Sequence, residues 1–189
     1  MSCYWLDWWV VMVEDGELLL ALLNTRPIRD GVENDELSDD GCARRWSQAR
    51  GGTGTTAELR RLRHLREHLT DVVLGRAPVT VLAEALEGVH QRPRLSEAGL
   101  SWELVTEPDM RLPARVVLAW ARVDENLPGR LRPCGNDECR LFLLDQSKAN
   151  RARWCSMATC GNRMKARRHY ERSRSRVPAG PGDRQGEPG

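Results

Sequence analysis

The sequence predicts an α+β protein: a mainly helical N-terminal domain with a small β-hairpin, followed by a small ββα module that contains four cysteines. Three observations support this prediction. Leucines recur at helical spacing between residues 55 and 75, two short apolar runs flank Gly99, and two C-x4-C pairs lie near the C-terminus. The 189 residues suffice for one ordinary domain and a small appendage, and the 30% charged and 40% hydrophobic composition is typical of a soluble protein.

Residues 4–13 form an apolar stretch with three tryptophans, one aspartate and no basic flank. The stretch is much shorter than the ~20 residues of a membrane helix, so we expect a strand or an N-terminal arm and no membrane span. Residues 17–25 are more uniformly apolar and predict a buried helix.

Capping signals predict the next two helices. Ser38, followed by two aspartates, is expected to cap a helix that runs through Trp46. Thr55 and Glu58 have the spacing of a capping box, and an apolar helix face then continues until Gly75. This face consists of Leu59, Leu62, Leu65, Leu69 and Val73.

Three further elements complete the helical domain. A helix is expected after Pro78, a hairpin over residues 92–105 around Gly99, and a last helix from Pro113 through Val123. This last helix is expected to end before a Pro-Gly dipeptide, which is a strong turn signal.

The Pro-Gly dipeptide, Pro128-Gly129, also predicts a domain boundary. We expect a mainly α domain over residues 1–129, the cysteine module over 130–176, and a disordered tail rich in Pro and Gly over 177–189. The formal charges of these three parts are −6, +9 and −1. An acidic domain is therefore followed by a strongly basic module, for which nucleic acid is the leading partner.

Four cysteines predict a metal site in the basic module. Cys134 and Cys139 form one C-x4-C pair, Cys155 and Cys160 form the other, and fifteen residues separate the two pairs. Zinc takes four thiolates at ~2.3 Å, and structural zinc sites are built from two such short arms. Two disulfides are the alternative, but no secretory signal accompanies them. We therefore expect a bound Zn²⁺.

The module is expected to fold around the ion. Residues 134–139 predict a knuckle, and residues 141–144 predict a strand that pairs with residues 151–154. Phe142 and Trp154 are the expected core beneath the metal. Because so small a core is weak, and structural zinc contributes ~10–16 kcal/mol of apparent binding energy in finger peptides, metal removal should unfold the module, residues 132–175.

A basic helix is expected to follow Cys160. Its basic residues lie along neighbouring stripes and are the predicted phosphate contacts, one of which can read a guanine in the major groove. These predicted contacts are Arg163, Lys165, Arg167, Arg168 and Arg172. Arg163 has a competing role as a brace of the fold, so Lys165, Arg167 and Arg168 carry the most weight.

One motif invites an enzymatic interpretation that local chemistry disfavours. Residues 64–68 have the H-x-x-E-H form of one class of metalloprotease. His64 and His68 are predicted to lie opposite the leucine face, next to arginines whose charge opposes a bound cation. Together with Arg66 and Asn24 they are possible ligand-pocket residues, although structural roles are expected for each. No other catalytic motif stands out, so we expect no enzyme.

The cysteine module resembles the CGNR zinc finger. The resemblance covers about residues 130–172 and rests on the runs Trp154-Cys155-Ser156-Met157 and Cys160-Gly161-Asn162-Arg163, with Cys134, Cys139, Phe142, Asp145 and Ser147. Upstream, residues 20–25 resemble the Leu/Phe-rich Asn-Thr segment of a domain called ABATE, which precedes this finger in stress-induced transcription regulators.

The resemblance implies a bacterial, cytoplasmic, zinc-dependent regulator that binds duplex DNA, with an N-terminal domain that senses a small-molecule ligand or mediates assembly. A finger that binds protein rather than DNA is the alternative, in which the basic face meets an acidic surface such as residues 30–40. RNA is less supported, because His169-Tyr170 offers few aromatic rings for stacking.

Overall fold

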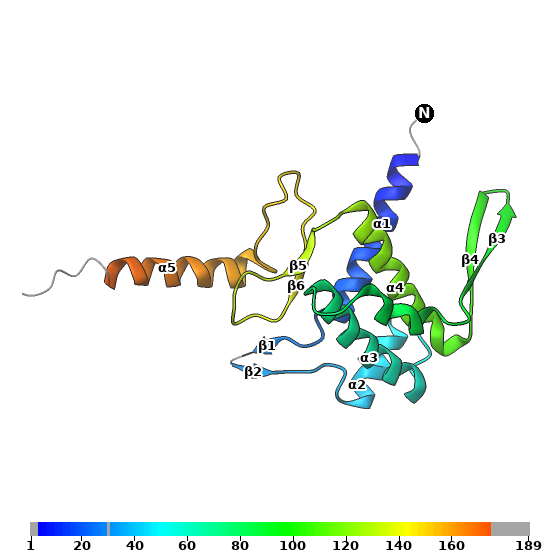
Figure 1. Cartoon of the computed structure of the whole chain (residues 1–189), viewed down its shortest axis with the longest axis horizontal. Coiled ribbons are helices and arrows are strands. Elements are labelled where there is room, and N and C mark those ends of the chain that lie inside the picture. The colour runs from blue at the N-terminus through cyan, green and yellow to red at the C-terminus, as the bar shows by residue number, and fades with distance from the viewer. Residues whose placement is uncertain (1–3, 30, 175–189) are drawn as a thin grey trace, which may run out of the picture. The chain divides into compact units, whose positions relative to one another are not determined.

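The computed structural model describes the backbone of residues 4–29 and 31–174 and, apart from Arg29, the side chains from Glu14 onward. The chain forms two compact units, Met1–Cys155 and Ser156–Gly189, which are considered separately below (Figure 1). The boundary at Pro128-Gly129 stays a prediction, and the tail over residues 177–189 lies outside the described part of the chain.

Helices and three two-stranded antiparallel ribbons alternate along the chain, which confirms the α+β class. The ribbons pair β1 with β2, β3 with β4, and β5 with β6. In chain order the described elements are α1 (Tyr4–Leu23), β1 (Ile28–Arg29), β2 (Val32–Glu33), α2 (Asp40–Gln48), α3 (Thr56–Val73), the 3₁₀ helix η1 (Val79–Leu86), β3 (His90–Ser96), β4 (Gly99–Val105), α4 (Pro108–Asn126), β5 (Leu131–Pro133), β6 (Phe142–Leu144), the π-helical turn η2 (Met157–Gly161) and α5 (Asn162–Arg174).

The first helix begins earlier than the sequence predicts. Residues 4–13, expected to be a strand or arm, belong to α1, so that prediction is wrong. Once residues 17–23 form a helix, each residue added at its N-terminus gains a hydrogen bond without a new nucleation cost, and no proline interrupts the extension. The buried helix predicted for residues 17–25 is confirmed, since Leu19 and Leu22 are 0% exposed.

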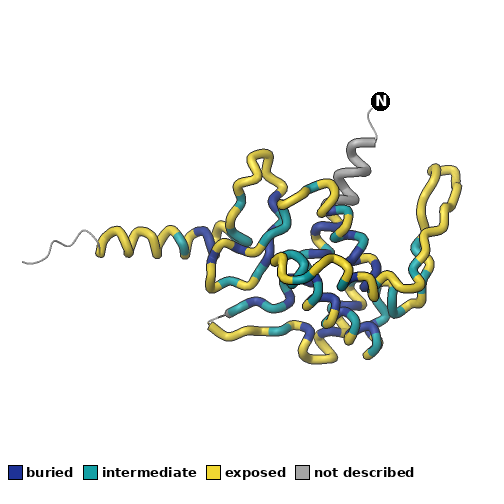
Figure 2. The backbone as a smooth tube through the Cα atoms, in the orientation of Figure 1, coloured by how far each residue is buried: buried dark blue, intermediate teal, exposed yellow. Residues whose placement is uncertain are grey.

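Helices α1, α3 and α4 pack around one leucine-rich core (Figure 2). The predicted face of α3 contributes four leucines to this core, and η1 closes one side through Leu82. The most fully buried core side chains are Leu19, Leu22, Leu37, Leu59, Leu62, Leu69, Leu112, Val116 and Val123. None of the described helices combines the length and apolarity needed to cross a bilayer.

Caps define α2 and α3. The cap of α2 is Asp39, whose carboxylate accepts a hydrogen bond from the Cys42 N–H at 2.7 Å, so the prediction of Ser38 is wrong by one residue. The Ser38 hydroxyl instead donates to the Asp35 carbonyl. The predicted cap of α3 is confirmed at Thr55, whose hydroxyl accepts from the Glu58 N–H at 3.2 Å. The Glu58 carboxylate accepts from the N–H groups of Thr53 and Gly54 rather than from that of Thr55, so the box is not reciprocal.

The remaining elements of the helical domain also match, with shifts at their ends. The predicted helix after Pro78 is present as η1, and the predicted hairpin is β3–β4. Helix α4 begins at Pro108, five residues before the expected Pro113. Pro108 suits the first position of a helix. Pro113 lies in the second turn, where it has no N–H to donate to the Asp109 carbonyl.

Candidate metal centre and basic surfaces

A tight turn after β5 carries the first two cysteines. The Cys134 N–H donates to the Leu141 carbonyl at 2.8 Å, and the Cys139 N–H donates to the Asn136 carbonyl at 2.8 Å. The Asn136 side chain is 1% exposed, and its Oδ1 accepts from the Glu138 N–H. This turn is the predicted knuckle, and it closes on a buried asparagine.

The other two cysteines are Cys155, directly before Ser156, and Cys160, four residues after it. The Cys155 N–H points at the Cys134 sulfur, 3.4 Å away, which is the kind of contact that stabilises a thiolate ligand. In the second unit Ser156 caps η2, where its hydroxyl accepts from the Thr159 N–H. Cys160 lies in this π-helical turn, which continues directly into α5 as the sequence predicts.

The four sulfur atoms of Cys134, Cys139, Cys155 and Cys160 all lie within 4.8 Å of one another. No disulfide joins them, and the 3.7 Å between the sulfurs of Cys139 and Cys155 far exceeds the ~2.05 Å of a disulfide. Four thiolates at ~2.3 Å from a tetrahedral ion have sulfurs about 3.8 Å apart. The donor set and its spacing therefore fit a tetrahedral metal ion.

The strand pairing in the module differs from the prediction. Strand β6 pairs with β5, in the register Pro133↔Phe142, and residues 151–154 form no strand. Those residues instead run beside the knuckle, where the Gly135 N–H donates to the Arg153 carbonyl at 2.7 Å. A side chain at position 135 would lie 3.1 Å from that carbonyl and 3.3 Å from the Trp154 ring, so glycine permits the approach.

The expected pairing of Phe142 with Trp154 as a separate core is also wrong. Phe142 is 5% exposed and belongs to the leucine-rich core of the helical domain, while Trp154 is half-buried beside the knuckle. A side chain at Gly16 of α1 would lie 2.7 Å from the Leu144 side chain. Strand β6 therefore packs closely on α1.

Asn24 fixes β6 to the end of α1, a role that sequence reasoning missed. Its side-chain Nδ2 donates to the Phe142 carbonyl at 3.1 Å, and its Oδ1 accepts from the Phe142 N–H at 2.7 Å. The amide thus bonds β6 as a neighbouring strand would. The available signal was the Asn-Thr pair that ends an apolar helix, where an amide side chain has no helical role.

We expect Asn24→Ala to destabilise the first unit by about 1–3 kcal/mol, because it leaves the Phe142 N–H and carbonyl without their partner in a half-buried position. Urea unfolding followed by far-UV circular dichroism measures this change. Asn126→Ala, which removes an exposed bond to the Arg122 carbonyl, is the matched control and should cost much less. Equal losses of unfolding free energy in the two variants would contradict the role of Asn24 in holding β6.

Asp145 organises the loop between β6 and the second pair of cysteines. It is 1% exposed and accepts hydrogen bonds from the N–H groups of Ser147 and Ala152 and from Arg132. The hydrogen bonds from Ser147, the Ala152 N–H and the nearby Arg132 charge lower the pKa of Asp145 to about 2. The carboxylate therefore stays ionised and holds both ends of the loop.

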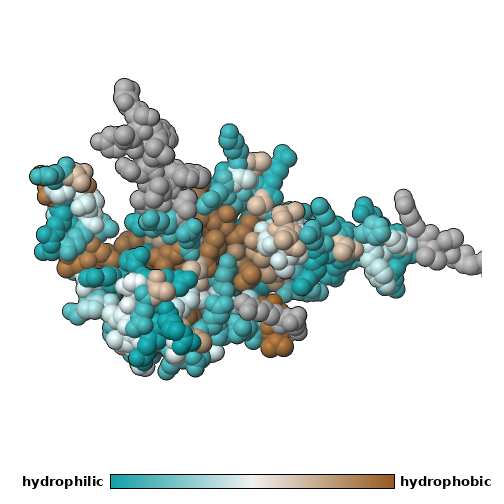
Figure 3. All heavy atoms as spheres, turned by 180° about the vertical axis from the view of Figure 1, so that it is seen from behind, coloured by the Kyte–Doolittle hydropathy of each residue, from teal (hydrophilic) through white to brown (hydrophobic). Residues whose placement is uncertain are grey.

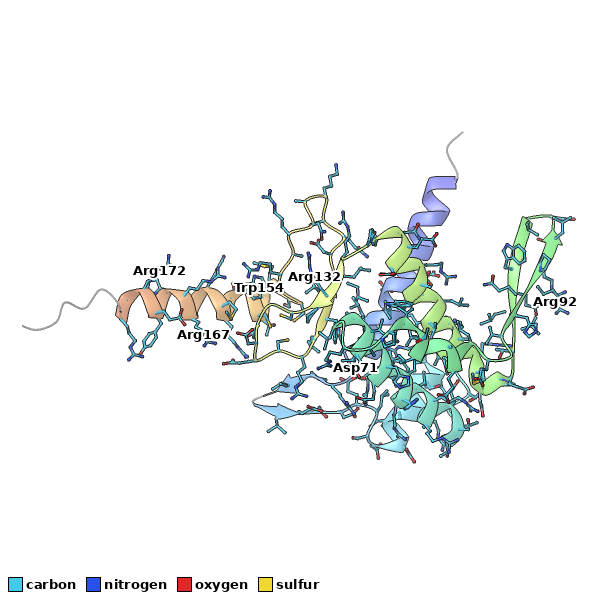
Figure 4. The ribbon with its side chains drawn as sticks, in the orientation of Figure 1. Asp71, Arg92, Arg132, Trp154, Arg167 and Arg172 are labelled. Atoms are coloured by element: carbon cyan, nitrogen blue, oxygen red, sulfur yellow. The ribbon has the colours of Figure 1, made fainter. Side chains whose placement is uncertain are left out.

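A basic hollow in the same region was not predicted. It is an open depression of about 610 Å³ lined by Arg132, Asn150, Arg151 and Arg153 with neighbouring backbone, and Figure 4 labels Arg132 beside β5. Arg151 and Arg153 are exposed. The available signal was alternating basic residues in two segments, Arg130 and Arg132 at β5 and Arg151 and Arg153 after β6, but their convergence depends on long-range contacts between these segments.

Helix α5 presents the predicted basic residues to solvent. The helix has six Lys or Arg residues, one Glu and no buried residue. Every predicted phosphate contact, Arg163, Lys165, Arg167, Arg168 and Arg172, is exposed. Arg167 also pairs with Glu171 at 3.3 Å, and the Arg172 guanidinium donates to the Arg168 carbonyl, so both side chains follow the helix (Figure 4). Their role in binding stays a prediction.

The histidines of the H-x-x-E-H motif lie at the surface of α3. The His64 and His68 rings are 4.1 Å apart, and Glu84 approaches His64 at 3.8 Å. In the described part of the chain, the four cysteines are the one group of at least three possible ligand side chains that converge on a metal position. Arg66 and Asn24 both have structural partners, as expected.

Comparisons with known families agree with this architecture. A family model described as "CGNR zinc finger" matches residues 130–173, and the model of ABATE, "Putative stress-induced transcription regulator", matches residues 16–127. No curated protein matches the chain. The ABATE match covers more than half of the 189 residues and ends just before the finger begins. The chain therefore belongs to the ABATE family and carries a CGNR zinc finger.

Proposed function

We propose that the chain is a zinc-dependent transcriptional regulator that binds duplex DNA and has no enzymatic activity. Zn²⁺ bound by the four cysteines would connect the two knuckles and fix the start of α5. Reduced thiolates and a DNA partner both suit the cytoplasm, where we place the protein. The observation that carries this proposal is a helix with a formal charge of +5 and no buried residue, which begins two residues after Cys160, the last of the four cysteines.

Electrostatics supports a phosphate partner over an apolar one. Helix α5 has a single carboxylate, Glu171, and its basic side chains face water along its whole length. Such a helix buries too little apolar surface for a stable protein interface, whereas phosphate contacts require exposed cations. The basic hollow at Arg132, Arg151 and Arg153 adds a second cationic surface in the first unit.

Salt dependence tests the phosphate contacts. With five contacts, a plot of log affinity against log salt should have a slope of roughly −4 to −5, and the double variant Arg167→Ala, Arg168→Ala should flatten it by nearly two. Fluorescence anisotropy with a labelled duplex measures the slope. Arg76→Ala, which alters an exposed arginine of the helical domain, is the control and should leave it unchanged.

The outcome also separates DNA binding from the protein-binding alternative. A slope that the double variant leaves unaltered would remove α5 from the interface. In the protein-binding alternative, binding would persist at high salt and depend on Tyr170, which is 64% exposed. Phe142 has no place in that alternative, because it is buried in the core.

A cavity supports ligand sensing as a second function, in the ABATE domain. It has a volume of about 260 Å³ and lies between the C-terminal ends of α3 and α4 and the start of β5. Most of the residues that line it are apolar, polar and apolar atoms share its exposed surface, and a single carboxylate lines it. The lining includes Val72, Trp120, Val123, Leu127, Leu131 and Asp124. Because β5 leads directly to Cys134, an occupant would touch the strand that begins the finger.

The wall chemistry favours a small apolar amine, whose ring packs on valine and leucine while its ammonium group meets Asp124 or the face of Trp120. Methyl NMR with phenethylamine as the probe tests this assignment. We expect saturable shifts of the Val72, Val123 and Leu127 methyl signals and none at the exposed Leu95. Equal shifts at all four positions would show non-specific contact and refute the site.

A further inference from the structure

The hairpin β3–β4 is exposed along almost its whole length. Its seven residue pairs run without a bulge from His90↔Val105 to Ser96↔Gly99. Every residue of β3 is exposed, and so is every residue of β4 except the half-buried Leu104. No other described element packs extensively against it, and in Figure 1 it extends past the helices of its unit.

The two faces of the hairpin differ in chemistry. On one face Glu103 bonds both Arg92 and Arg94 at 2.7 Å, and Figure 4 labels Arg92 there. Alternate residues form the other face, the apolar hairpin face, which consists of Gln91, Pro93, Leu95, Leu100, Trp102 and Leu104. It carries no charge, and its apolar side chains face water: Leu95 is 85% exposed, Leu100 62% and Trp102 60%. Figure 3, which shows the molecule from behind, has the hairpin at the left, with hydrophilic residues over most of it and apolar residues at its edge.

Such a face requires an explanation, because an isolated two-stranded hairpin is marginally stable in water. Cross-strand pairs Leu95↔Leu100 and Pro93↔Trp102 place the apolar side chains directly opposite one another, so they form one continuous patch. Scattered surface leucines are ordinary, whereas a contiguous apolar patch rimmed by polar residues marks an interaction site.

We propose that the apolar hairpin face is covered by the same face of a second copy of this chain. The face has no charged residue to select a charged partner, and two identical uncharged faces meet without like-charge repulsion. With residue areas of ~200–250 Å², the exposed fractions of Leu95, Leu100 and Trp102, together with the exposed Pro93, give about 500 Å² of apolar surface for each face. Two faces together bury about 1,000 Å², which is the lower limit for a specific interface, and predict a reversible dimer.

The strand edges of the hairpin favour a dimer that packs face to face over one that pairs strands edge to edge. Pro93 lies in the middle of β3, where it has no N–H to offer another strand, and this blunts the β3 edge. Face-to-face packing of two hairpins instead gives a four-stranded, two-layer sandwich with sheets ~10 Å apart. Trp102, the largest side chain of the face, becomes the central anchor of the interface.

The dimer is tested without DNA, on the zinc-loaded full-length protein. Sedimentation velocity from about 1 to 100 μM should show a concentration-dependent shift from monomer to dimer. Trp102→Glu should shift the midpoint at least 10-fold to higher concentration. Arg92→Ser, on the opposite face of the same hairpin, is the matched control and should leave the midpoint within about twofold, since its ion pair is exposed.

Two variants with opposite charges distinguish a lost interface from a misfolded chain. One chain carries Leu95→Lys and Leu100→Lys, the other carries Leu95→Glu and Leu100→Glu. We expect each to be monomeric alone and a mixture to form a heterodimer, because opposite charges then meet across the interface. A wild-type chain that stays monomeric at the highest concentration, or a Trp102→Glu chain that dimerises unchanged, would overturn the proposal.

Discussion

Treating the zinc-loaded protein with a chelator is expected to unfold the first knuckle, the loop over residues 145–155 and the second unit, while α1, α3 and α4 stay folded. In the second unit only Cys160 and Gly161 are buried among the described residues, so nothing apolar replaces the ion. Structural zinc contributes ~10–16 kcal/mol of apparent binding energy in finger peptides, far more than this segment's own contacts can supply.

The structure narrows the region that unfolds. The sequence led us to expect unfolding of residues 132–175, but Phe142 lies in the leucine-rich core and its backbone bonds Asn24. We therefore expect β6 to survive chelation. In amide NMR spectra the signals of Asn136 and Thr159 should move to random-coil positions, and those of Leu62 and Phe142 should keep their native shifts.

Single cysteine variants give the matched comparison for chelation. Cys155→Ser should reproduce its effect, because three thiolates and a hydroxyl bind zinc more weakly than four thiolates. Cys42→Ser should change nothing, since Cys42 is exposed and lies outside the cluster. If chelation leaves the signals of Asn136 and Thr159 in place, the cysteines do not hold a structural ion.

The helical domain followed from local signals in the sequence. The cap at Thr55, the leucine period of α3 and the Gly99 turn each act within a few residues, so the sequence alone fixes them. Ser38 competed with the adjacent Asp39 as a cap, and both are good caps. Propensity could not decide between them, because the choice depends on which carboxylate reaches the Cys42 N–H.

In the cysteine module, too, one feature was predictable from the sequence and another was not. The spacing of the four cysteines predicted their convergence, because each C-x4-C arm is a local unit. The strand that pairs with β6 was not predictable. Both β5 and residues 151–154 are short segments with alternating arginines, so their local patterns do not distinguish them. The choice rests on long-range contacts of Phe142 with Asn24 and the helical core, which no local pattern encodes.

A buried arginine ties the segment after α1 to α3. Arg66 is 2% exposed and donates to the Thr25 hydroxyl at 2.8 Å and to both carboxylate oxygens of Asp35, at 2.6 and 2.8 Å. Arg26 bonds the same carboxylate at 2.9 Å. Burial opposes ionisation of Asp35, but the hydrogen bonds from Arg66 and Arg26 outweigh it and hold the pKa of Asp35 well below its usual range.

Replacing Arg66 with alanine is expected to lower the free energy of unfolding by about 3 kcal/mol or more, because it leaves the Asp35 carboxylate without its main partner and opens a space in α3. Asp35→Ala should cost a similar amount, since it strands the Arg66 charge. Urea unfolding at neutral pH measures both. The cost of the double variant should be smaller than the sum of the two, and the difference gives the coupling energy.

An exposed pair provides the scale for this measurement. Arg76 and Asp71 lie 2.9 Å apart with side chains 59% and 44% exposed, so Arg76→Ala should cost less than about 1 kcal/mol. Acid adds an independent readout: because the pKa of Asp35 is depressed, its stabilisation is complete above the ordinary value of 3.8 and declines as the pH falls below it. Asp35→Asn should therefore weaken the loss of stability in acid. If the losses of unfolding free energy in the two single variants simply add in the double variant, and Asp35→Asn leaves the loss of stability at low pH unchanged, Arg66 acts only by filling space.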